Sequence, residues 1–251
     1  MRHYLLSIII CTAALLFAAC QPDDIEGNET FKREYRVKTF DNYTFDYNSD
    51  GTVASISSPS GKRVFEYSGK SLNITNGDAT EYQITLNKDG FATKIVRSGH
   101  TWTVDYNKAG YMTKVSLDGV QNTSQNISSG DITYWTAYDR DNDFWRRNEA
   151  SYLPKVNVGQ VQTLWAEASG LDRWMFEARL LGNTSTSVVE TSRWTEFAGK
   201  DKNTSVYDYE YDANGCIVLE IEYLGEWNEW DLSELKRIES HSFTWEAIPL
   251  P

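Results

Sequence analysis

The residues best suited to bind a ligand lie near the end of the chain, in the segment Trp227-Asn228-Glu229-Trp230. Two tryptophans three positions apart can stack on the faces of sugar rings, while the amide and carboxylate between them can bond to hydroxyl groups. The segment is acidic and follows an expected strand end at Leu224-Gly225. The simpler interpretation is that these rings plug the mouth of a barrel; the alternative, which makes Trp227, Asn228, Glu229 and Trp230 the candidate ligand-binding residues, is a platform for a ligand.

Two carboxylates could support hydrolysis. Glu220 and Glu222 lie on one face of an expected strand, about 7 Å apart, and glycoside hydrolases use carboxyl pairs about 5 or 6.5–9.5 Å apart. Alternate acids are also common on an exposed strand face, and nothing near these residues indicates a pocket that raises a pKa. We therefore expect a solvated strand face and no catalytic residues, with a glycoside hydrolase-like enzyme as the third hypothesis for function.

An acidic turn in the middle of the chain has the beginning of a calcium-binding loop. Asp139, Asp141 and Asp143 alternate as such ligands do, but Phe144 stands where the loop needs glycine and Ala150 where it needs a bidentate glutamate. We expect a solvated turn between two strands. The sequence predicts no metal site and no cofactor.

The other residue types that commonly carry catalysis are scarce. Beyond the N-terminal segment, the only histidines are His100 and His241, and the only cysteine beyond Cys20 is Cys216. The chain contains no Gly-x-Ser-x-Gly elbow, His-Glu-x-x-His motif or phosphate-binding glycine loop. We expect both histidines to make surface or half-buried hydrogen bonds, and the cysteine count excludes a disulfide framework.

The elements that would position these residues are β-hairpins, because one hairpin pattern occurs four times. In each copy, apolar residues stand eight, six and four positions before a glycine and two after it. A period of two places them on one face of a strand, and the glycine supplies the positive φ of a tight turn. The four glycines are Gly51, Gly90, Gly110 and Gly215.

Further strands complete an all-β, antiparallel β-meander that is curled or closed into a soluble barrel, since closure removes exposed edges. We expect one domain over residues 31–251, because nothing after residue 30 resembles a long linker. Residues 121–130 are predicted as a polar loop, and residues 161–170 as a short helix or inserted loop. The further strands are predicted at Asp131–Tyr138, Ser187–Phe197 and Lys236–Ile248.

The N-terminus predicts export and lipid attachment. A weakly basic start is followed by an apolar run that ends in small residues at Cys20, as in a secretory signal. The run resembles the lipobox of bacterial lipoproteins, and the acidic residues after it resemble the surface-export signal of Bacteroides lipoproteins. We therefore predict a signal peptide over residues 1–19, lipidation of Cys20 and an acidic tether over residues 20–30.

The net charge of the chain limits the kinds of molecule that it can bind. The chain has 24 basic and 36 acidic residues, a net charge of −12, which becomes −13 when residues 1–19 with Arg2 are removed. Strong negative charge argues against nucleic acid and against electrostatic docking on anionic lipid. The membrane contact expected here is the lipid anchor alone.

The residue pattern of the hairpins resembles sequences of known families. Tyr211-Asp212-Ala213-Asn214-Gly215 resembles the YD repeat of bacterial toxin shells, but the chain is far shorter than such a shell. With the lipobox and the overall length, the hairpins are more similar to a family of Bacteroides lipoproteins of unknown function with a porin-like, soluble β-barrel domain. This resemblance implies a fold and an outer-membrane location but no chemistry.

Three functions remain open at this stage. The first is a lipid-anchored protein of the outer membrane, facing the cell exterior, that binds an extracellular glycan or small amphiphile without catalysis. The alternative is a structural or interaction module that docks a protein partner in an outer-membrane complex. The third is the hydrolase described above.

Overall fold

The computed structural model describes most of the chain after its N-terminal segment. Several residues singled out above lie outside the described residues, so the predictions for them stay predictions; these are Cys20, the acidic turn at Asp139–Asp143 and the Trp227–Trp230 segment. The described residues are 35–138, 144–164, 169–196, 202–226 and 235–248.

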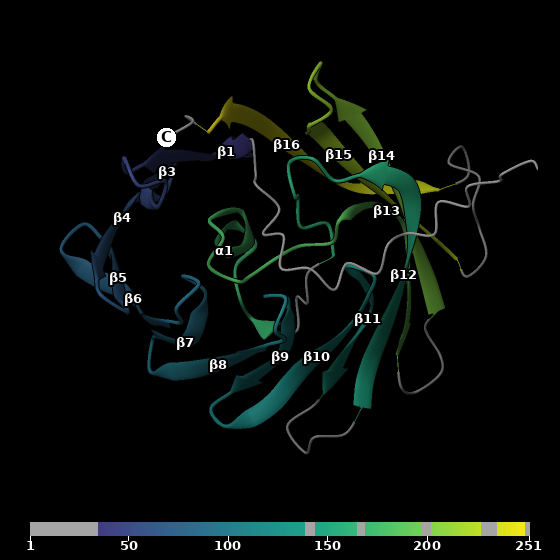
Figure 1. Cartoon of the computed structure of the whole chain (residues 1–251). Coiled ribbons are helices and arrows are strands. Elements are labelled where there is room, and N and C mark those ends of the chain that lie inside the picture. Colours follow the sequence, from purple (N-terminus) through teal and green to yellow (C-terminus); the bar gives the residue numbers. More distant parts are fainter. Residues whose placement is uncertain (1–34, 139–143, 165–168, 197–201, 227–234, 249–251) are drawn as a thin grey trace, which may run out of the picture.

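Sixteen antiparallel strands of the described residues form a closed barrel, seen end-on in Figure 1. Each strand pairs with its neighbour in the chain, and β1 pairs with β16 to close the ring. The predicted all-β meander is confirmed, and of the two forms left open it is the closed one. The strands are β1 (Tyr35–Phe40), β2 (Tyr43–Tyr47), β3 (Val53–Ser58), β4 (Gly61–Ser68), β5 (Ser71–Asn76), β6 (Ala79–Leu86), β7 (Ala92–Arg97), β8 (His100–Tyr106), β9 (Met112–Leu117), β10 (Val120–Ser128), β11 (Asp131–Tyr138), β12 (Phe144–Val156), β13 (Ser187–Glu196), β14 (Lys202–Tyr211), β15 (Ile217–Glu226) and β16 (Lys236–Ala247).

The four predicted hairpins are confirmed as β2–β3, β6–β7, β8–β9 and β14–β15. Their turns share one geometry, in which the glycine N–H donates to the carbonyl of the residue three positions earlier. In the first copy, Gly51 N donates to Asn48 O at 3.0 Å, and Asn48 N donates to Thr52 O at 2.8 Å. The φ of Gly51 is +86°, which explains the need for a residue without a Cβ.

The prediction of a polar loop over residues 121–130 is wrong, because most of that segment is strand β10. β10 pairs with both β9 and β11, so its backbone groups are satisfied by a ladder although few of its side chains are apolar. Its inward-facing Thr123 is 1% exposed, so this part of the wall has polar residues on its buried face. The strands predicted at Asp131–Tyr138, Ser187–Phe197 and Lys236–Ile248 are confirmed as β11, β13 and β16, with ends shifted by no more than one residue.

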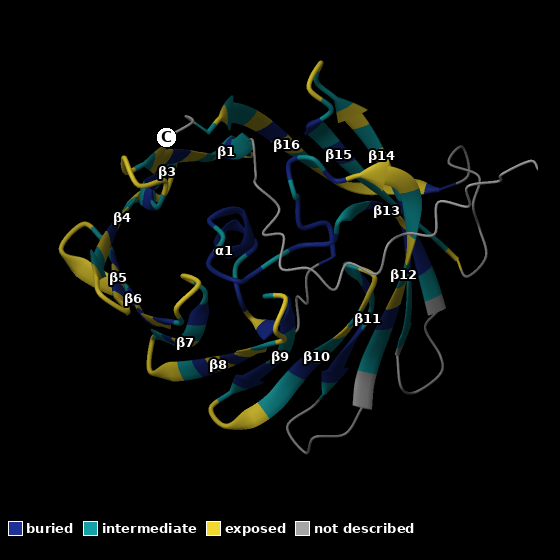
Figure 2. Ribbon diagram, in the orientation of Figure 1, coloured by how far each residue is buried: buried dark blue, intermediate teal, exposed yellow. Residues whose placement is uncertain are grey.

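Between β12 and β13 the chain passes through the inside of the barrel (Figure 1). We call described residues 157–164 and 169–186 the luminal segment; it contains the one helix among the described residues, α1 (Trp174–Glu177). The predicted short helix or inserted loop at 161–170 is therefore the first part of a longer inserted segment. Figure 2 shows α1 and its surroundings as buried.

Apolar side chains of the luminal segment pack against the inner faces of β1–β9 in one hydrophobic core. Burial of each such side chain contributes roughly 1.5–3 kcal/mol, so this contact dominates the stability of the segment. Trp174 lies edge-on to Phe65 and Tyr82, with ring centroids 6.0 and 5.6 Å away. The other large apolar residues of the segment in this core are Met175, Phe176, Leu180 and Leu181.

Hydrogen bonds fix the luminal segment to the wall on both sides of α1. Trp102 Nε1 donates to Ser169 O at 2.7 Å, and the Tyr82 hydroxyl donates to Asp172 Oδ2 at 2.5 Å. After the helix, the segment continues the backbone bonding of the wall, as Ala92 N donates to Leu180 O at 2.7 Å. These bonds satisfy polar groups that would otherwise be buried without partners.

The two halves of the barrel differ in length. Strands β1–β9 have five to eight residues, whereas β10–β16 have eight to thirteen. On the outer face of the first half, most exposed positions are polar or charged, including Lys62, Glu66, Gln83, Lys94 and Asp105, and the exception among the large apolar residues described there is Val64 of β4. No helix within the described residues has the length and hydropathy needed to cross a membrane.

The docking of the luminal segment can be tested with two glycines that share a φ of +86°. A Cβ on Gly182 would meet the carbonyl oxygen of Gly110 and the Tyr106 ring at 2.8 Å, whereas a Cβ on Gly51 would meet no atom within 4 Å. Both substitutions by alanine carry the backbone strain of about 1–2 kcal/mol. We expect Gly182→Ala to lower the free energy of unfolding by roughly 1–3 kcal/mol more than Gly51→Ala in chemical denaturation. Equal losses would show that the segment is not held tightly against the wall.

Candidate functional site

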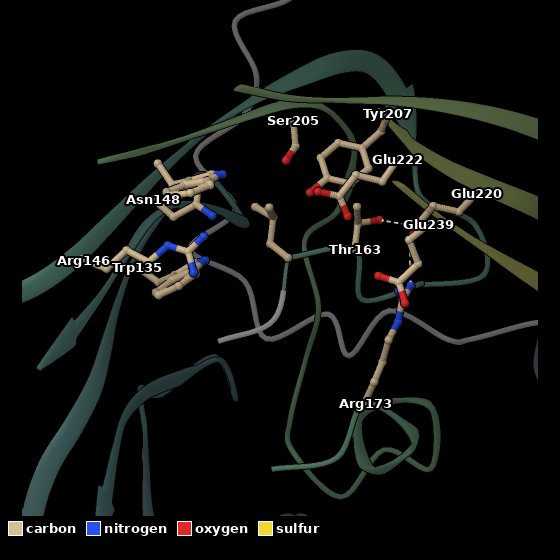
Figure 3. A pocket seen from close by; sticks show the side chains of 12 residues that line it. Trp135, Arg146, Asn148, Thr163, Arg173, Ser205, Tyr207, Glu220, Glu222 and Glu239 are labelled. Atoms are coloured by element: carbon tan, nitrogen blue, oxygen red, sulfur yellow. Dashed lines mark hydrogen bonds and ion pairs between the residues drawn. The ribbon is translucent and has the colours of Figure 1, made fainter. Parts of the chain in front are cut away.

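A polar pocket remains in the half of the barrel that the apolar side chains of the luminal segment do not fill. It encloses about 70 Å³ and is bounded by the inner faces of β11–β16 and by the start of the luminal segment. This is room for several water molecules or for one small polar group of a larger ligand. Figure 3 shows its side chains converging from two opposite walls and from a floor.

The first wall comes from β11, β12 and β13. Strand alternation turns Arg146 and Asn148 inward, and the register places Asn148 between Trp135 and Trp194 of the flanking strands. The Arg146 guanidinium lies 4.0 Å from the centroid of the Trp194 ring and 5.9 Å from that of Trp135. The aromatic rings hold the cation in place, because their faces are electron-rich.

Two hydrogen-bond donors of residues in this wall that line the pocket are buried without a partner among the described residues: Trp135 Nε1 and Arg146 Nε. Trp135 is only 4% exposed. A buried donor without an acceptor costs about 1–3 kcal/mol, so such groups point to something that is bound there. The oxygen of the neighbouring Asn148 side chain is already used, since it accepts a hydrogen bond from Ser192 Oγ.

The second wall comes from β14, β15 and β16 and is acidic. Glu222 stands opposite Tyr207 in one pairing and opposite Glu239 in the other. Burial, followed by the charges of Glu222 and Glu220, raises the pKa of Tyr207 well above its ordinary value. The phenol therefore keeps its proton at every physiological pH, and it has a side-chain hydrogen bond with Ser205.

The floor is a buried ion pair between the luminal segment and the wall. Arg173 Nη2 lies 2.9 Å from Glu220 Oε1, and Thr163 Oγ1 donates to Glu220 Oε2 at 2.6 Å. Arg173 Nε also lies 3.9 Å from the buried carboxylate of Glu177. Burial acts to lower the pKa of Arg173, but the charges of Glu220 and Glu177 outweigh it and raise that pKa.

The expectation that Glu220 and Glu222 lie on a solvated strand face is wrong. Both face the lumen, and Glu220 is 2% exposed. The alternation of acids along β15 was read correctly, but the sequence does not show that the barrel interior at this face holds an arginine. Each oxygen of Glu220 is engaged, one by Arg173 and one by Thr163, so this carboxylate has a structural role.

The two histidines make the hydrogen bonds predicted for them. His241 Nδ1 lies 2.7 Å from Asp41 Oδ2, and His100 Nδ1 lies 2.7 Å from Asp118 Oδ2. The remaining nitrogen of His241 lies 3.3 Å from Glu239 at the edge of the pocket. Cys216 is buried, and the described residues hold no group of three or more His, Cys, Asp or Glu placed to bind a metal ion.

A second cavity lies at the opposite mouth of the barrel, between the β2–β3 and β6–β7 turns and the residues that follow α1. It encloses about 500 Å³, within the range of small-molecule sites. Its lining is more apolar than that of the first pocket and includes Tyr47, Tyr67, Leu86, Phe91 and Leu180.

Sequence reasoning missed the first wall altogether. One signal was present: β12 and β13 have charged, amide or hydroxyl side chains on both faces, as at Arg146, Asn148, Ser192 and Arg193. A strand that is polar on both faces indicates a barrel whose interior is partly wet.

Two of the solved structures that share the fold are porin-like proteins. A crystal structure of a porin-like protein from Bacteroides uniformis has a TM-score of 0.60 and 16% sequence identity, and the match covers 81% of this chain and 89% of that one. A crystal structure of a porin-like protein from Bacteroides vulgatus has a TM-score of 0.57 and 10% identity, covering 86% of this chain and 99% of that one. No protein-family model and no curated protein matches the chain. At these identities the likeness establishes a porin-like barrel fold.

The floor predicts an asymmetric response to substitution. Removing one partner of a buried ion pair leaves the other charge uncompensated and costs about 3–5 kcal/mol, whereas replacing both partners with apolar groups costs much less. We expect Arg173→Met to destabilise more than Glu220→Gln, because it leaves Glu177 as well as Glu220 without a nearby cation. The double variant Arg173→Met/Glu220→Leu should recover part of the loss in urea denaturation. Additive losses would contradict the pairing.

Proposed function

We propose that this protein is a non-catalytic, lipid-anchored barrel of the cell surface that binds a small polar ligand, of the glycan type, in its luminal pocket. One observation carries the proposal. The pocket brings two tryptophans, a stacked arginine and two buried unpartnered donors to face an acidic wall. Ring faces together with donors and acceptors are what recognition of a hydroxyl-bearing ring requires.

Binding fits the lumen better than conduction does. Barrels of sixteen strands leave an aqueous channel when nothing occupies them. Here the luminal segment packs into the core and is tied to several strands, from β6 to β15. A lumen with a packed segment on one side and a small polar pocket on the other is suited to hold a ligand.

The predicted Trp227–Trp230 ligand platform stays a separate proposal, because these residues lie outside the described part of the chain. The second cavity, with its apolar lining, is the proposed site for a small amphiphile.

The absence of catalysis is also a proposal, supported by the state of the carboxylates. Glycosidases need one carboxyl group that is free to donate a proton and one that is free to attack or to activate water. Arg173 and Thr163 hold both oxygens of Glu220. Glu220 is therefore not free to donate a proton, to attack the sugar or to activate water.

The location outside the membrane is proposed from the charged outer face of the first half of the barrel. An integral barrel turns an apolar band to lipid. The exposed Lys62 and Glu66 of β4, Lys94 of β7 and Asp105 of β8 do not fit such a band. A lipid anchor on Cys20 would then hold a water-exposed barrel at the membrane.

Ligand binding is tested with residues 21–251 and a panel of monosaccharides, oligosaccharides and bile-type amphiphiles, read by tryptophan fluorescence and calorimetry. We expect saturable binding of one sugar class, lost in Ser205→Leu, which fills the pocket, and retained in Ser57→Leu, which changes the outer face of β3. Binding of an amphiphile should survive Ser205→Leu, because the second cavity lies elsewhere. No binding across the panel would contradict the proposal and favour a protein partner.

Anchoring is tested by Cys20→Ser in the full chain. We expect the wild type to fractionate with membranes and to carry acyl chains on its N-terminal residue in mass spectrometry, because several acyl chains hold a domain far more firmly than one. The Cys20→Ser variant should appear in the soluble fraction, whereas Cys216→Ser should remain with membranes. Membrane association of Cys20→Ser equal to that of the wild type would rule out the anchor.

A further inference from the structure

We infer that the luminal pocket selects an acetamido sugar, whose acetamido oxygen accepts hydrogen bonds from Trp135 and Gln125 and whose amide N–H donates to Glu222. This inference rests on the proposed function and specifies the ligand of the same site. The observation behind it is a pair of buried hydrogen-bond donors at facing positions of β10 and β11. Figure 3 shows one of these residues, Trp135, on the side of the pocket opposite Glu222.

The two donors belong to side chains that stand directly opposite each other in the sheet. Gln125 of β10 pairs with Trp135 of β11, so both are on one face, which is the inner face because Trp135 lines the pocket. Trp135 Nε1 and Gln125 Nε2 are buried and have no hydrogen-bond partner among the described residues. The other register partner of Trp135 is Asn148, whose oxygen already accepts a hydrogen bond from Ser192 Oγ. This part of the wall therefore offers two donors and needs an acceptor.

A carbonyl oxygen is the acceptor that suits two neighbouring donors. It has two lone pairs and carries no proton, so it can satisfy both N–H groups and brings no donor of its own. A hydroxyl group also has two lone pairs, but its proton would need a further acceptor beside the two N–H groups. Because a buried donor without an acceptor is costly, a ligand with a carbonyl group is favoured over one with hydroxyl groups alone.

The rest of the pocket supplies contacts for the other atoms of an acetamido group. Glu222 lines the acidic wall, and a carboxylate has about four lone-pair sites, so it can accept the amide N–H in addition to its other bonds. Leu164 and the Trp194 ring also line the pocket and give the methyl group apolar contacts. The enclosed volume of about 70 Å³ suits a small group of this kind, while the sugar ring that carries it extends beyond the enclosed part.

An acetamido group is neutral, which fits a pocket lined by side chains of both signs. A carboxylate in this space would approach Glu222 and Glu239, and an ammonium group would approach Arg146. Burying a charge is far more costly than burying a polar group whose hydrogen bonds are satisfied. The amide offers one acceptor and one donor without either penalty.

The test uses four sugars that differ in one substituent: glucose, glucosamine, glucuronate and N-acetylglucosamine. Calorimetry on residues 21–251 should give the lowest Kd for N-acetylglucosamine, lower than that of each of the other three by about tenfold or more, because the acetamido group gains hydrogen bonds that they lack. The ratio of the glucose Kd to the N-acetylglucosamine Kd is the quantity to compare between variants.

Variants assign this ratio to the two donors. Trp135→Phe keeps an aromatic ring but removes the N–H, and Gln125→Met keeps the length of the side chain but removes the amide. Each should lower the ratio by roughly threefold to tenfold, the range expected for one hydrogen bond.

Two matched controls carry the same substitutions at other positions. In Trp102→Phe the lost indole N–H is one that already has an acceptor, the carbonyl of Ser169, and in Gln83→Met the lost amide is exposed on the outer face of β6. Neither residue lines the pocket, so the ratio should stay at its wild-type value in both controls. A melting temperature of each pocket variant no lower than that of Trp102→Phe shows that its change in Kd does not come from unfolding.

The outcomes separate this inference from the proposed function. Equal binding of the four sugars, tighter binding of glucosamine or glucuronate than of N-acetylglucosamine, or a ratio that survives both pocket variants would overturn the acetamido inference and leave glycan binding in place. A ratio that falls equally in the controls would overturn it as well. Binding of none of the four, together with silence across the wider panel, would overturn both.

Discussion

A closed barrel of sixteen strands encloses more space than the side chains of its own wall can fill, and the rest of this structure follows from that constraint. Barrels of about eight strands are filled by their inward side chains, and barrels of sixteen to eighteen are wide enough for a channel. In this chain the space is taken by the luminal segment between β12 and β13. The segment is therefore part of the hydrophobic core.

The segment fills the lumen unevenly, and this divides the interior into two chemical environments. Against β1–β9 it presents Trp174, Met175 and Leu181, and the wall opposite is apolar. Against β15 it presents Arg173, whose ion pair with Glu220 is the polar counterpart of that packing. Beyond the ion pair the segment meets the wall with Thr163 and Leu164 instead of the side chains of α1, and the polar pocket is found there.

The part of the fold that the sequence predicts is the part determined by neighbours in the chain. The four glycine turns and the strands with period two were predicted correctly, because a hairpin is specified by about a dozen consecutive residues. The environment of an inward residue depends on what lies across the lumen. Glu220 looked like one acid of a solvated face because Arg173, 47 residues away in the chain, was not visible as its partner. The Trp227–Trp230 segment lies outside the described residues, so its prediction stands untested.

The closing contact between β1 and β16 joins the two ends of the described chain: Arg36 bonds to Glu246 across 210 residues of sequence. Every other wall pairing connects strands that follow one another, so the sheet can grow strand by strand from local contacts, and ring closure has by far the largest loop-closure entropy. The luminal segment packs on the inner face of this sheet, so closure of the ring completes the wall around it. The kinetics of folding should therefore be governed by a late step in which an open, curved sheet with two unpaired edges wraps around its own insertion. Until that step, those edges are the surfaces most exposed to pairing with another chain.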